Sequence, residues 1–366
     1  QGKRCAYYED TSPRLYPCWS GFSTLKTPTS TSPAIPRSFR ERTVSPRFMS
    51  NFASGYVKYI NHLEQINDAA VSCPQRMIAE VEDAYHDHLE NIARNITSHH
   101  RQVRVIMLSG PSSSGKTTTA HLLRDYLTAF GANTTIVSLD DFYRGVGKAP
   151  QLPGGQFDYE SVKALDEEAV KGCLLDIIST GEFSVPTYNF TLGRPEGELR
   201  RYKLGPQDMV IVEGIHGLNP QFTRELPEGS CVKLYVSVKQ QIKSANGEVI
   251  SPMDLRLVRR IVRDIQFRDT SPERTLAMWP QVGKGEDRYI RPYRLTADYT
   301  VNSIHIYEPC VMRRVAIPLL RAIAEDSPYY KKARDLESRL MRFEPIDESL
   351  VPENSMLREF LGPVKK

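Results

Sequence analysis

The sequence lacks paired cysteines, long apolar runs and a strong excess of one charge. Its six cysteines show no C-x-x-C spacing, which excludes a zinc motif and a disulfide framework and suits a reducing compartment. No apolar run approaches about 18 residues, so we expect no transmembrane helix. A net charge of +4 does not by itself indicate nucleic-acid binding. The 366 residues allow one large α/β domain with extensions, or two domains.

Acidic residues are nearly missing between positions 11 and 50. Half of these positions are Ser, Thr or Pro, six are Lys or Arg, and Glu41 is the single acid. Such a segment cannot bury enough apolar surface to order itself. We expect residues 1–50 to be a disordered linker or a mitochondrial targeting remnant, which makes the protein cytoplasmic or mitochondrial. The basic arm could also contact RNA or a protein assembly partner.

Residues 110–117 match the phosphate-loop pattern G-x-x-x-x-G-K-[ST] at every fixed position. An apolar run at 103–108 predicts a strand before the loop, and apolar spacing over 116–130 predicts a helix after it. This arrangement points a helix N-terminus at an anion. Loop amides then surround phosphate, Lys116 reaches the outer phosphates and the Thr117 hydroxyl ligates Mg²⁺. The motif therefore predicts a site for ATP and Mg²⁺.

Strands and helices alternate after residue 101. Helical spacing within 51–100 precedes predicted strands at 134–139, 209–212, 232–236 and 299–301, and predicted helices at 161–180, 252–267 and 309–324. We expect an α/β fold, a P-loop NTPase-type parallel sheet with helices on both faces and a helical N-terminal extension. The expected units are an arm (1–50), a helical extension (51–100), a kinase domain (101–325), and a C-terminal helix with a loose tail (326–366).

Acids follow two of these strands. Asp140 and Asp141 end the second strand, and both should face the crevice of the phosphate loop, where one orients an acceptor hydroxyl. The alternative is a helix cap or turn pair. Glu213 ends the strand at 209–212, as in a Walker-B arrangement that holds Mg²⁺. The alternative is an acid that caps the strand.

Arginines lie at helical spacing in the predicted helix 252–267, opposite an apolar side that includes Leu255 and Ile265. Charge on one helix face is usually a solvated surface. Guanidinium groups also suit phosphate oxygens, so this face could instead close over triphosphate. Spacing alone leaves both interpretations open for Arg256, Arg259, Arg260 and Arg263, which Arg268 follows.

Taken together, these motifs resemble the uridine kinase and phosphoribulokinase family of P-loop kinases over about residues 101–324. The greatest likeness is to the bacterial uridine kinase-like domain that is joined to threonyl-tRNA synthetase-like modules, although no such module is recognisable in the first hundred residues. The stretches that carry the resemblance are 109–117, 138–143, 157–160, 186–190, 213–220 and 259–264.

The resemblance implies a role for each matching residue. Asp140 corresponds to the catalytic base, with Lys116 and Arg263 as further catalytic residues, and Glu213 joins Thr117 at the metal. Tyr159 and Glu160 match an aromatic and a ribose-binding acid. The implied acceptor-binding set is Asp140, Tyr143, Tyr159, Glu160, Tyr188 and Phe190. The implied nucleotide-binding set is Gly110, Pro111, Ser112, Ser113, Ser114, Gly115, Lys116, Thr117, Thr118, Arg260 and Arg268.

Two positions depart from the family pattern. Gly193 stands where uridine–cytidine kinases carry a histidine that contacts the pyrimidine, and Glu160 is longer than the usual aspartate. The sequence therefore favours ATP-dependent phosphorylation of a small-molecule hydroxyl, foremost the 5′-hydroxyl of a nucleoside such as uridine. The alternatives are another hydroxyl acceptor, or a kinase-like assembly factor that uses nucleotide as a switch with RNA or protein partners. A homo-oligomer is compatible with the sequence.

Overall fold

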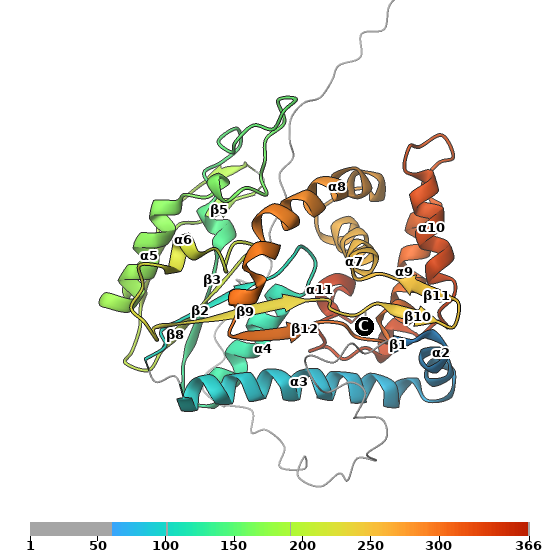
Figure 1. The fold of residues 1–366 in the computed structure, drawn as a ribbon, viewed down its shortest axis with the longest axis horizontal. Helices are drawn as coiled ribbons and strands as arrows, with labels where there is room; N and C mark the ends of the chain where they lie inside the picture. The colour runs from blue at the N-terminus through green and yellow to red at the C-terminus, as the bar shows by residue number, and fades with distance from the viewer. Residues whose placement is uncertain (1–60, 100–101, 191, 365–366) are drawn as a thin grey trace, which may run out of the picture.

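A five-stranded parallel sheet organises the kinase region in a computed structural model that describes residues 61–99, 102–190 and 192–364. The predicted arm at 1–50 lies outside the described residues. Strand order is β12-β9-β2-β8-β3, and every neighbouring pair is parallel (Figure 1). The strands are β2 (Val105–Ser109), β3 (Thr134–Ser138), β8 (Met209–Glu213), β9 (Cys231–Ser237) and β12 (Tyr299–Asn302).

Alternate side chains of each strand enter different cores. Ile106 and Leu108 of β2 belong to one buried cluster, whereas Val105 and Met107 belong to the other. The first cluster lies under α4 (Lys116–Ala129), α7 (Pro252–Phe267) and α9 (Glu308–Arg321), and the second under α5 (Glu167–Ser179). Because strand side chains point alternately to the two faces, a sheet covered on both sides needs apolar residues at successive positions. The predicted fold class is confirmed.

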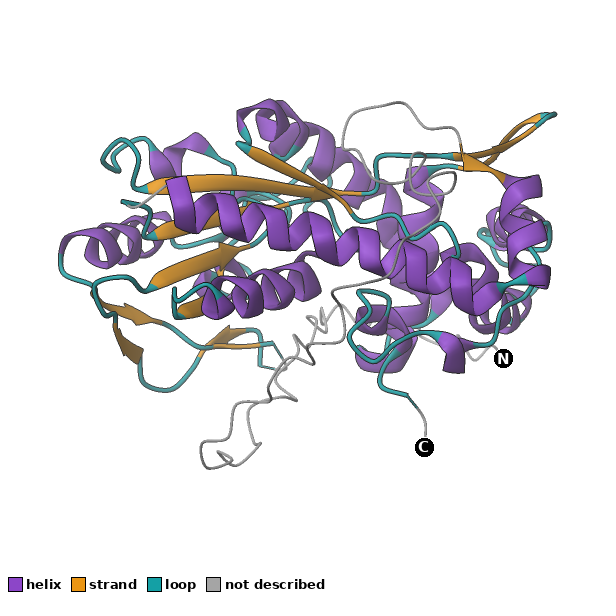
Figure 2. Cartoon of the chain, turned by 90° about the horizontal axis from the view of Figure 1, so that it is seen from below, coloured by secondary structure: helices purple, strands orange, loops and turns teal. Residues whose placement is uncertain are grey.

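Two helices precede the sheet, α2 (Leu63–Ser72) and α3 (Pro74–His99). Helix α3 runs along the length of the molecule and packs against α4 (Figures 1 and 2). Met77, Val81 and Tyr85, spaced four residues apart, are buried in the same core as β2 and β9. The predicted helical extension therefore shares the core of the kinase region. No helix in the described part of the chain is long and apolar enough to cross a membrane.

The helix predicted at 161–180 begins later than expected. Residues Val162–Ala164 form a 3-10 turn, η3, and α5 starts at Glu167. Asp166 caps this start, since its carboxylate accepts a hydrogen bond from the Ala169 amide at 3.2 Å. A side-chain cap at this position satisfies a free amide of the first helical turn and fixes where the helix begins.

Short strands that the sequence did not predict form three small sheets, separate from the central one, in the described residues. Between α5 and β8 lie two antiparallel pairs, β4 (Glu182–Val185) with β7 (Arg200–Lys203) and β5 (Tyr188–Asn189) with β6 (Arg194–Pro195). Between β9 and α7 lies the hairpin of β10 (Ile242–Ser244) and β11 (Gly247–Ile250), which β1 (Asn61–His62) joins. Other elements that precede α9 are η2 (Leu139–Phe142), α6 (Pro220–Thr223), α8 (Pro272–Tyr289) and η4 (Arg291–Thr296).

The expected loose C-terminal tail is wrong. After α10 (Tyr330–Leu340), the chain passes through η5 (Glu348–Leu350) to α11 (Arg358–Leu361), which packs on α7. Phe343, Met356 and Phe360 are fully buried within the core that contains the sheet. Apolar residues spread between charged ones thus anchor this segment, and their burial stabilises the kinase region.

Candidate active site

The phosphate loop joins β2 to α4 in a tight turn. Ser113 and Gly115 both adopt positive φ, 57° and 84°, a left-handed conformation that turns successive amides inward. A Cβ on Gly110 would lie 2.1 Å from the carbonyl oxygen of Val236, so the neighbouring strand β9 leaves no room for a side chain there. The first intrahelical bond after the loop runs from the Thr119 amide to the Gly115 carbonyl at 3.0 Å. The amides of Lys116 and Thr117, which precede it in the first turn of α4, have no intrahelical acceptor and can bind an anion.

Side chains in the loop fit a phosphate chain. The hydroxyl oxygens of Ser113 and Ser114 are buried, and neither has a hydrogen-bond partner among the described residues. The Lys116 ammonium donates to the Pro111 carbonyl at 3.2 Å and lies near Glu213 and Asp140. Burial lowers the pKa of Lys116, and the neighbouring carboxylates oppose that shift. A partly buried cation beside unpartnered hydroxyls and helix amides suits a polyphosphate.

A cavity of about 180 Å³ opens beside the loop at the carboxyl ends of β2, β8 and β3. This edge is where ligands bind in parallel α/β sheets. The predicted site residues that line it are Ser112, Ser113, Lys116, Thr117, Asp140, Tyr143, Tyr159, Glu160, Tyr188, Phe190, Glu213, Arg260, Arg263 and Arg268. The remaining predicted loop residues do not line this cavity; they are Gly110, Pro111, Ser114, Gly115 and Thr118.

Glu213 lies at the end of β8, where its carboxylate accepts a hydrogen bond from the Ser138 hydroxyl at 2.9 Å. Burial, reinforced by the charge of Asp140, raises the pKa of Glu213 to about 7. In the described chain, no group of three His, Cys, Asp or Glu side chains is arranged to hold a metal ion. Mg²⁺ commonly uses one or two carboxylates together with substrate phosphates, so Thr117 and Glu213 fit that pattern.

The adjacent acids Asp140 and Asp141 point in different directions, which corrects the expectation that both face the crevice. Asp140 lines the cavity, and Ser138 caps η2 by accepting from the Asp140 amide at 3.3 Å. Asp141 instead forms an ion pair with Arg200 on β7 and accepts from the Tyr188 amide at 3.5 Å. Burial raises the pKa of Asp141, and Arg200 opposes that shift. Of these two acids, only Asp140 lines the cavity.

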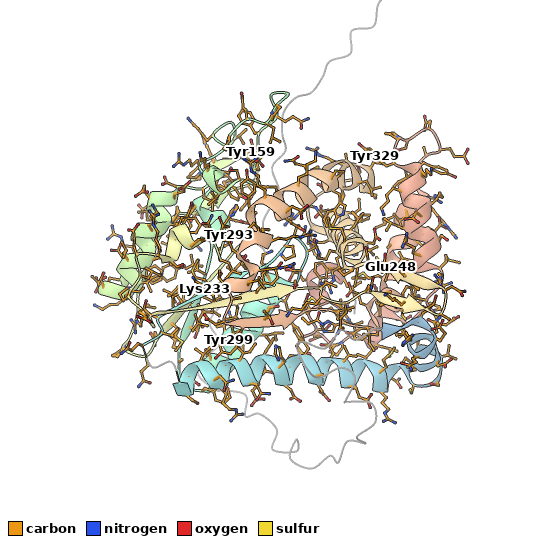
Figure 3. The ribbon with its side chains drawn as sticks, viewed as in Figure 1. Tyr159, Lys233, Glu248, Tyr293, Tyr299 and Tyr329 are labelled. Carbon is orange, nitrogen blue, oxygen red and sulfur yellow. The ribbon has the colours of Figure 1, made fainter. Side chains whose placement is uncertain are left out.

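Aromatic rings form one wall of the cavity. The ring of Tyr188 lies 5.9 Å from Tyr143 and 4.8 Å from Phe190, measured between centroids. Tyr143 donates from its hydroxyl to the carbonyl of Tyr159, which comes from the loops after β3 (Figure 3). Glu160 follows, and burial raises its pKa to about 7. The cavity therefore combines a ring-lined side with an acid, which suits a ligand that carries both a flat group and hydroxyls.

Gly193 contributes backbone to the loop beside these rings. Its carbonyl accepts from the Val146 amide at 2.7 Å, and its φ of 64° is left-handed. Gly193 does not line the cavity. The position at which the family resemblance places a pyrimidine-contacting histidine thus holds a turn.

The interpretation of the arginine face as solvated surface is wrong. Arg256 and Arg259 are buried in bidentate pairs with Glu286 and Glu308, and their guanidinium groups donate to the Ser112 and Ser113 carbonyls at 2.8 and 3.3 Å. Ile265, placed on the apolar side, is 38% exposed.

The other three arginines, Arg260, Arg263 and Arg268, line the cavity near the loop, and their closure over triphosphate stays a prediction. Arg260 donates to the Ser112 hydroxyl at 2.7 Å, and Arg263 pairs with Asp264 at 2.9 Å. Burial, reinforced by Arg268, lowers the pKa of Arg263 to about 10. These cations lie beside the phosphate loop, where guanidinium groups suit negative charge.

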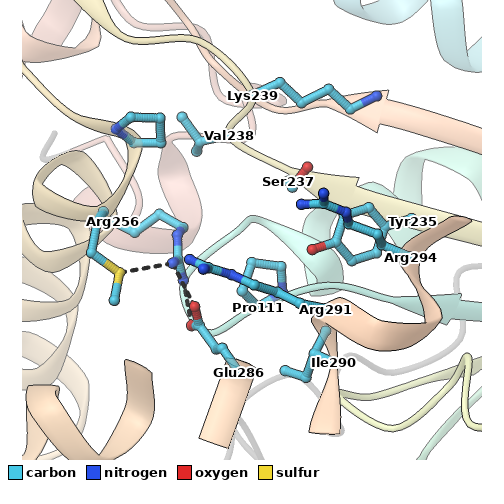
Figure 4. Close-up of a pocket in the computed structure, with 12 residues that line it drawn as sticks. Pro111, Tyr235, Ser237, Val238, Lys239, Arg256, Glu286, Ile290, Arg291 and Arg294 are labelled. Atoms are coloured by element: carbon cyan, nitrogen blue, oxygen red, sulfur yellow. Dashed lines mark hydrogen bonds and ion pairs between the residues drawn. The ribbon is translucent and has the colours of Figure 1, made fainter. Parts of the chain in front are cut away.

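A second cavity of about 270 Å³ lies behind the loop, where Pro111 and the Arg256–Glu286 pair form part of its wall (Figure 4). Arg291 and Arg294 border it, and Arg291 pairs with Asp287 at 2.6 Å. Asp140, Glu160 and Tyr188, the predicted acceptor side, do not line it. The residues predicted to bind an acceptor thus line only the cavity in front of the loop.

Sequence reasoning missed Glu359, which lines the front cavity from the C-terminal segment. Its carboxylate accepts from the amide and the hydroxyl of Thr118 at 3.2 and 3.0 Å. The motifs stop well before this residue, and no spacing in the charged C-terminal region points to it. Only the fold brings positions 118 and 359 together.

Comparisons with known proteins agree with this geometry. A sequence model described as "Phosphoribulokinase / Uridine kinase family" matches residues 105–307. The chain belongs to this family. The protein is therefore related to kinases that act on small molecules, while the likeness to domains joined to threonyl-tRNA synthetase-like modules stays a prediction.

Individual relatives cover the kinase region. Uridine-cytidine kinase B of Dictyostelium discoideum is 28% identical over 215 residues, which span 58% of this chain and 80% of that protein. A uridine kinase of Staphylococcus haemolyticus is 27% identical over 54% of this chain and 86% of its own length. A solved structure described as a possible uridine kinase from Bacillus stearothermophilus superposes with a TM-score of 0.42 at 18% identity, covering 58% of this chain and 97% of that one.

Proposed function

We propose that this protein is an ATP- and Mg²⁺-dependent kinase that phosphorylates the 5′-hydroxyl of a nucleoside such as uridine. The observation that carries the proposal is the convergence, in one cavity, of Lys116 and Thr117 with Asp140 and with the ring wall around Tyr188. One of the relatives is named as a uridine-cytidine kinase and another as a uridine kinase. Donor and acceptor residues thus share one space at the edge of the sheet.

Each group has a defined task. Loop amides and Lys116 bind the outer phosphates, while Thr117 and Glu213 hold Mg²⁺, which supplies charge neutralisation when bound. Asp140 accepts the proton of the attacking hydroxyl, and Glu160 accepts hydrogen bonds from the ribose hydroxyls. Arg260, Arg263 and Arg268 stabilise negative charge as the phosphoryl group moves. Catalysis is then mainly positioning and electrostatic stabilisation.

The acceptor's identity is tested by a panel of nucleosides and small hydroxyl compounds with ATP and Mg²⁺, scored for ADP release. We expect the greatest turnover with a pyrimidine nucleoside. Because Gly193 provides no side chain, we expect weaker discrimination between bases than a histidine at that position would give. ATP binding without turnover on any acceptor would contradict the kinase proposal and favour a nucleotide-switch protein.

Asp140→Asn tests the proton acceptor. The amide keeps the shape of the side chain and cannot take the proton, so turnover should fall by about 100-fold or more, within the range of general-base contributions. ATP affinity, measured by calorimetry, should stay unchanged. Asp141→Asn is the matched comparison on the next residue, and it should retain most of the turnover. Equal loss in both variants would remove the assignment of Asp140.

A further inference from the structure

The C-terminal segment reaches back to the phosphate loop across some 240 residues of sequence. Glu359 accepts two hydrogen bonds from Thr118, one from the amide at 3.2 Å and one from the hydroxyl at 3.0 Å. Met356 packs on Gly115, since a Cβ added there would lie 2.6 Å from the Met356 sulfur. Glu359 and Met356 lie outside residues 105–307, the part that the family model matches, whereas Thr118 and Gly115 lie within it. The contacts therefore join a segment beyond the shared kinase region to the phosphate loop.

The Thr118 amide is one of the donors that a phosphate loop offers to its ligand. It belongs to the first turn of α4, and helical pairing begins only at Thr119, whose amide bonds to Gly115. Amides of this turn surround the phosphates in loops of this type. A carboxylate on this amide thus uses a position that a phosphate oxygen would take. The positive end of the helix dipole favours either anion there.

The segment is fixed, whereas the Glu359 side chain is only partly buried. Phe360 is fully buried beneath the guanidinium of Arg259, 5.1 Å from its ring centroid, and Ser355 donates to the buried Glu82 at 2.6 Å. Arg358 donates to the carbonyls of Glu348 and Pro352 at 2.9 and 3.2 Å. Phosphate can therefore displace the carboxylate by rotation of one side chain, without release of the segment.

We propose that Glu359 is an affinity-determining residue of the nucleotide site, whose carboxylate competes with nucleotide phosphate for the Thr118 amide. This inference rests on the proposed function, because it assumes that the loop binds ATP. Near Lys116 and Arg263, Glu359 neutralises part of the positive charge while the site is empty. It leaves the amide, and lowers net affinity, when the more highly charged phosphate chain arrives.

The test compares wild type, Glu359→Gln and Glu353→Gln by calorimetry with ATP, ADP, inorganic pyrophosphate and adenosine. Glu353 is an exposed acid of the same segment and serves as the matched control. Glu359→Gln should tighten binding of ATP, ADP and pyrophosphate by roughly tenfold, the equivalent of one charge-assisted hydrogen bond. Adenosine affinity should not change, and Glu353→Gln should match wild type. Melting curves check that each variant is folded, and Glu359→Ala is the second variant.

The outcomes separate the inference from the proposed function. Absence of ATP binding in wild type would remove the proposed function itself. If wild type binds ATP and Glu359→Gln binds it equally or more weakly, the function stands and the competition is wrong. An equal gain for adenosine would place the effect away from the phosphates, and an equal gain in Glu353→Gln would reduce it to general surface charge. Either result would overturn the inference.

Discussion

Arg259 of α7 and Glu308 of α9 form an ion pair in which neither side chain is exposed to solvent. The guanidinium donates to both carboxylate oxygens, at 2.5 and 2.7 Å, and also to the Ser303 carbonyl at 2.7 Å. Through its bond to Ser113, the same arginine reaches the phosphate loop. One buried charge thus joins the loop, the end of β12 and the start of α9.

Removing one partner of this pair should strongly destabilise the protein. Glu308→Gln leaves a buried cation without its counter-charge, which costs about 3–5 kcal/mol of unfolding free energy. The control is Asp347→Asn in the pair with Arg314, whose side chains are about half exposed, and this substitution should cost far less stability. Urea denaturation monitored by circular dichroism gives both values. Similar losses in the two variants would contradict this account.

Asp141 should affect acceptor binding rather than chemistry. Its pairing with Arg200 and the Tyr188 amide holds β7 and the ring wall against η2. We expect Asp141→Asn and Arg200→Gln each to raise the acceptor KM by about fivefold, equivalent to about 1 kcal/mol, with kcat and ATP affinity near wild type. Steady-state kinetics at varied acceptor concentration measures the acceptor KM and kcat separately. A fall in kcat alone would mean that Asp141 takes part in the reaction.

Two glycines of α8 offer a matched pair of substitutions. A Cβ on Gly285 would lie 2.5 Å from the Cβ of Glu160, close to its backbone, so Gly285→Ala must displace Glu160. A Cβ on Gly283 would meet only the flexible end of Met253, at 2.9 Å.

Gly285→Ala should raise the acceptor KM several-fold and cost about 1–3 kcal/mol of stability. Gly283→Ala should be neutral or stabilising by up to about 1 kcal/mol. If the two variants have the same acceptor KM, Glu160 does not contribute to acceptor binding.

Glu160 should also make stability depend on pH. Burial raises its pKa from an ordinary 4.5 to about 7. Between these values the folded protein holds a proton that the unfolded chain has lost, so the free energy of unfolding falls as pH rises from 4.5 to about 7 and then levels off. Glu213 contributes in the same window, so the comparison must be with Glu160→Gln.

Urea denaturation at pH 5 and pH 8, without ligands, measures this contribution. The decline in wild type should exceed that in Glu160→Gln by on the order of 2 kcal/mol, allowing for partial exposure of the carboxyl group. Identical declines would show that Glu160 titrates at its ordinary pKa in the folded protein.

The sequence predicted the sheet, the phosphate loop and helix 252–267 because these depend on local patterns. Buried parallel strands are continuous apolar runs, and the loop needs glycines at fixed positions. It could not decide the arginine face, because the acids that bury Arg256 and Arg259 lie 30 and 49 residues further along the chain. The sequence could not predict Glu359 as a site residue for the same reason, because its partner Thr118 lies far away along the chain. Periodicity describes one element, whereas burial depends on what the fold places opposite it.

The C-terminal segment gives a direct test of that distinction. Its spread of charge predicted a loose tail, yet Phe343, Leu357 and Phe360 are fully buried in the central core. Truncation after Leu340 should therefore unfold the protein or make it insoluble, because each large apolar side chain removed costs about 3–5 kcal/mol, and typical domains hold only about 5–15 kcal/mol in total. Truncation after Gly362 removes no buried apolar residue and should melt like the full chain. Soluble yield and thermal melting of the two truncations give the answer, and a folded protein ending at Leu340 would show that the kinase region does not depend on this segment.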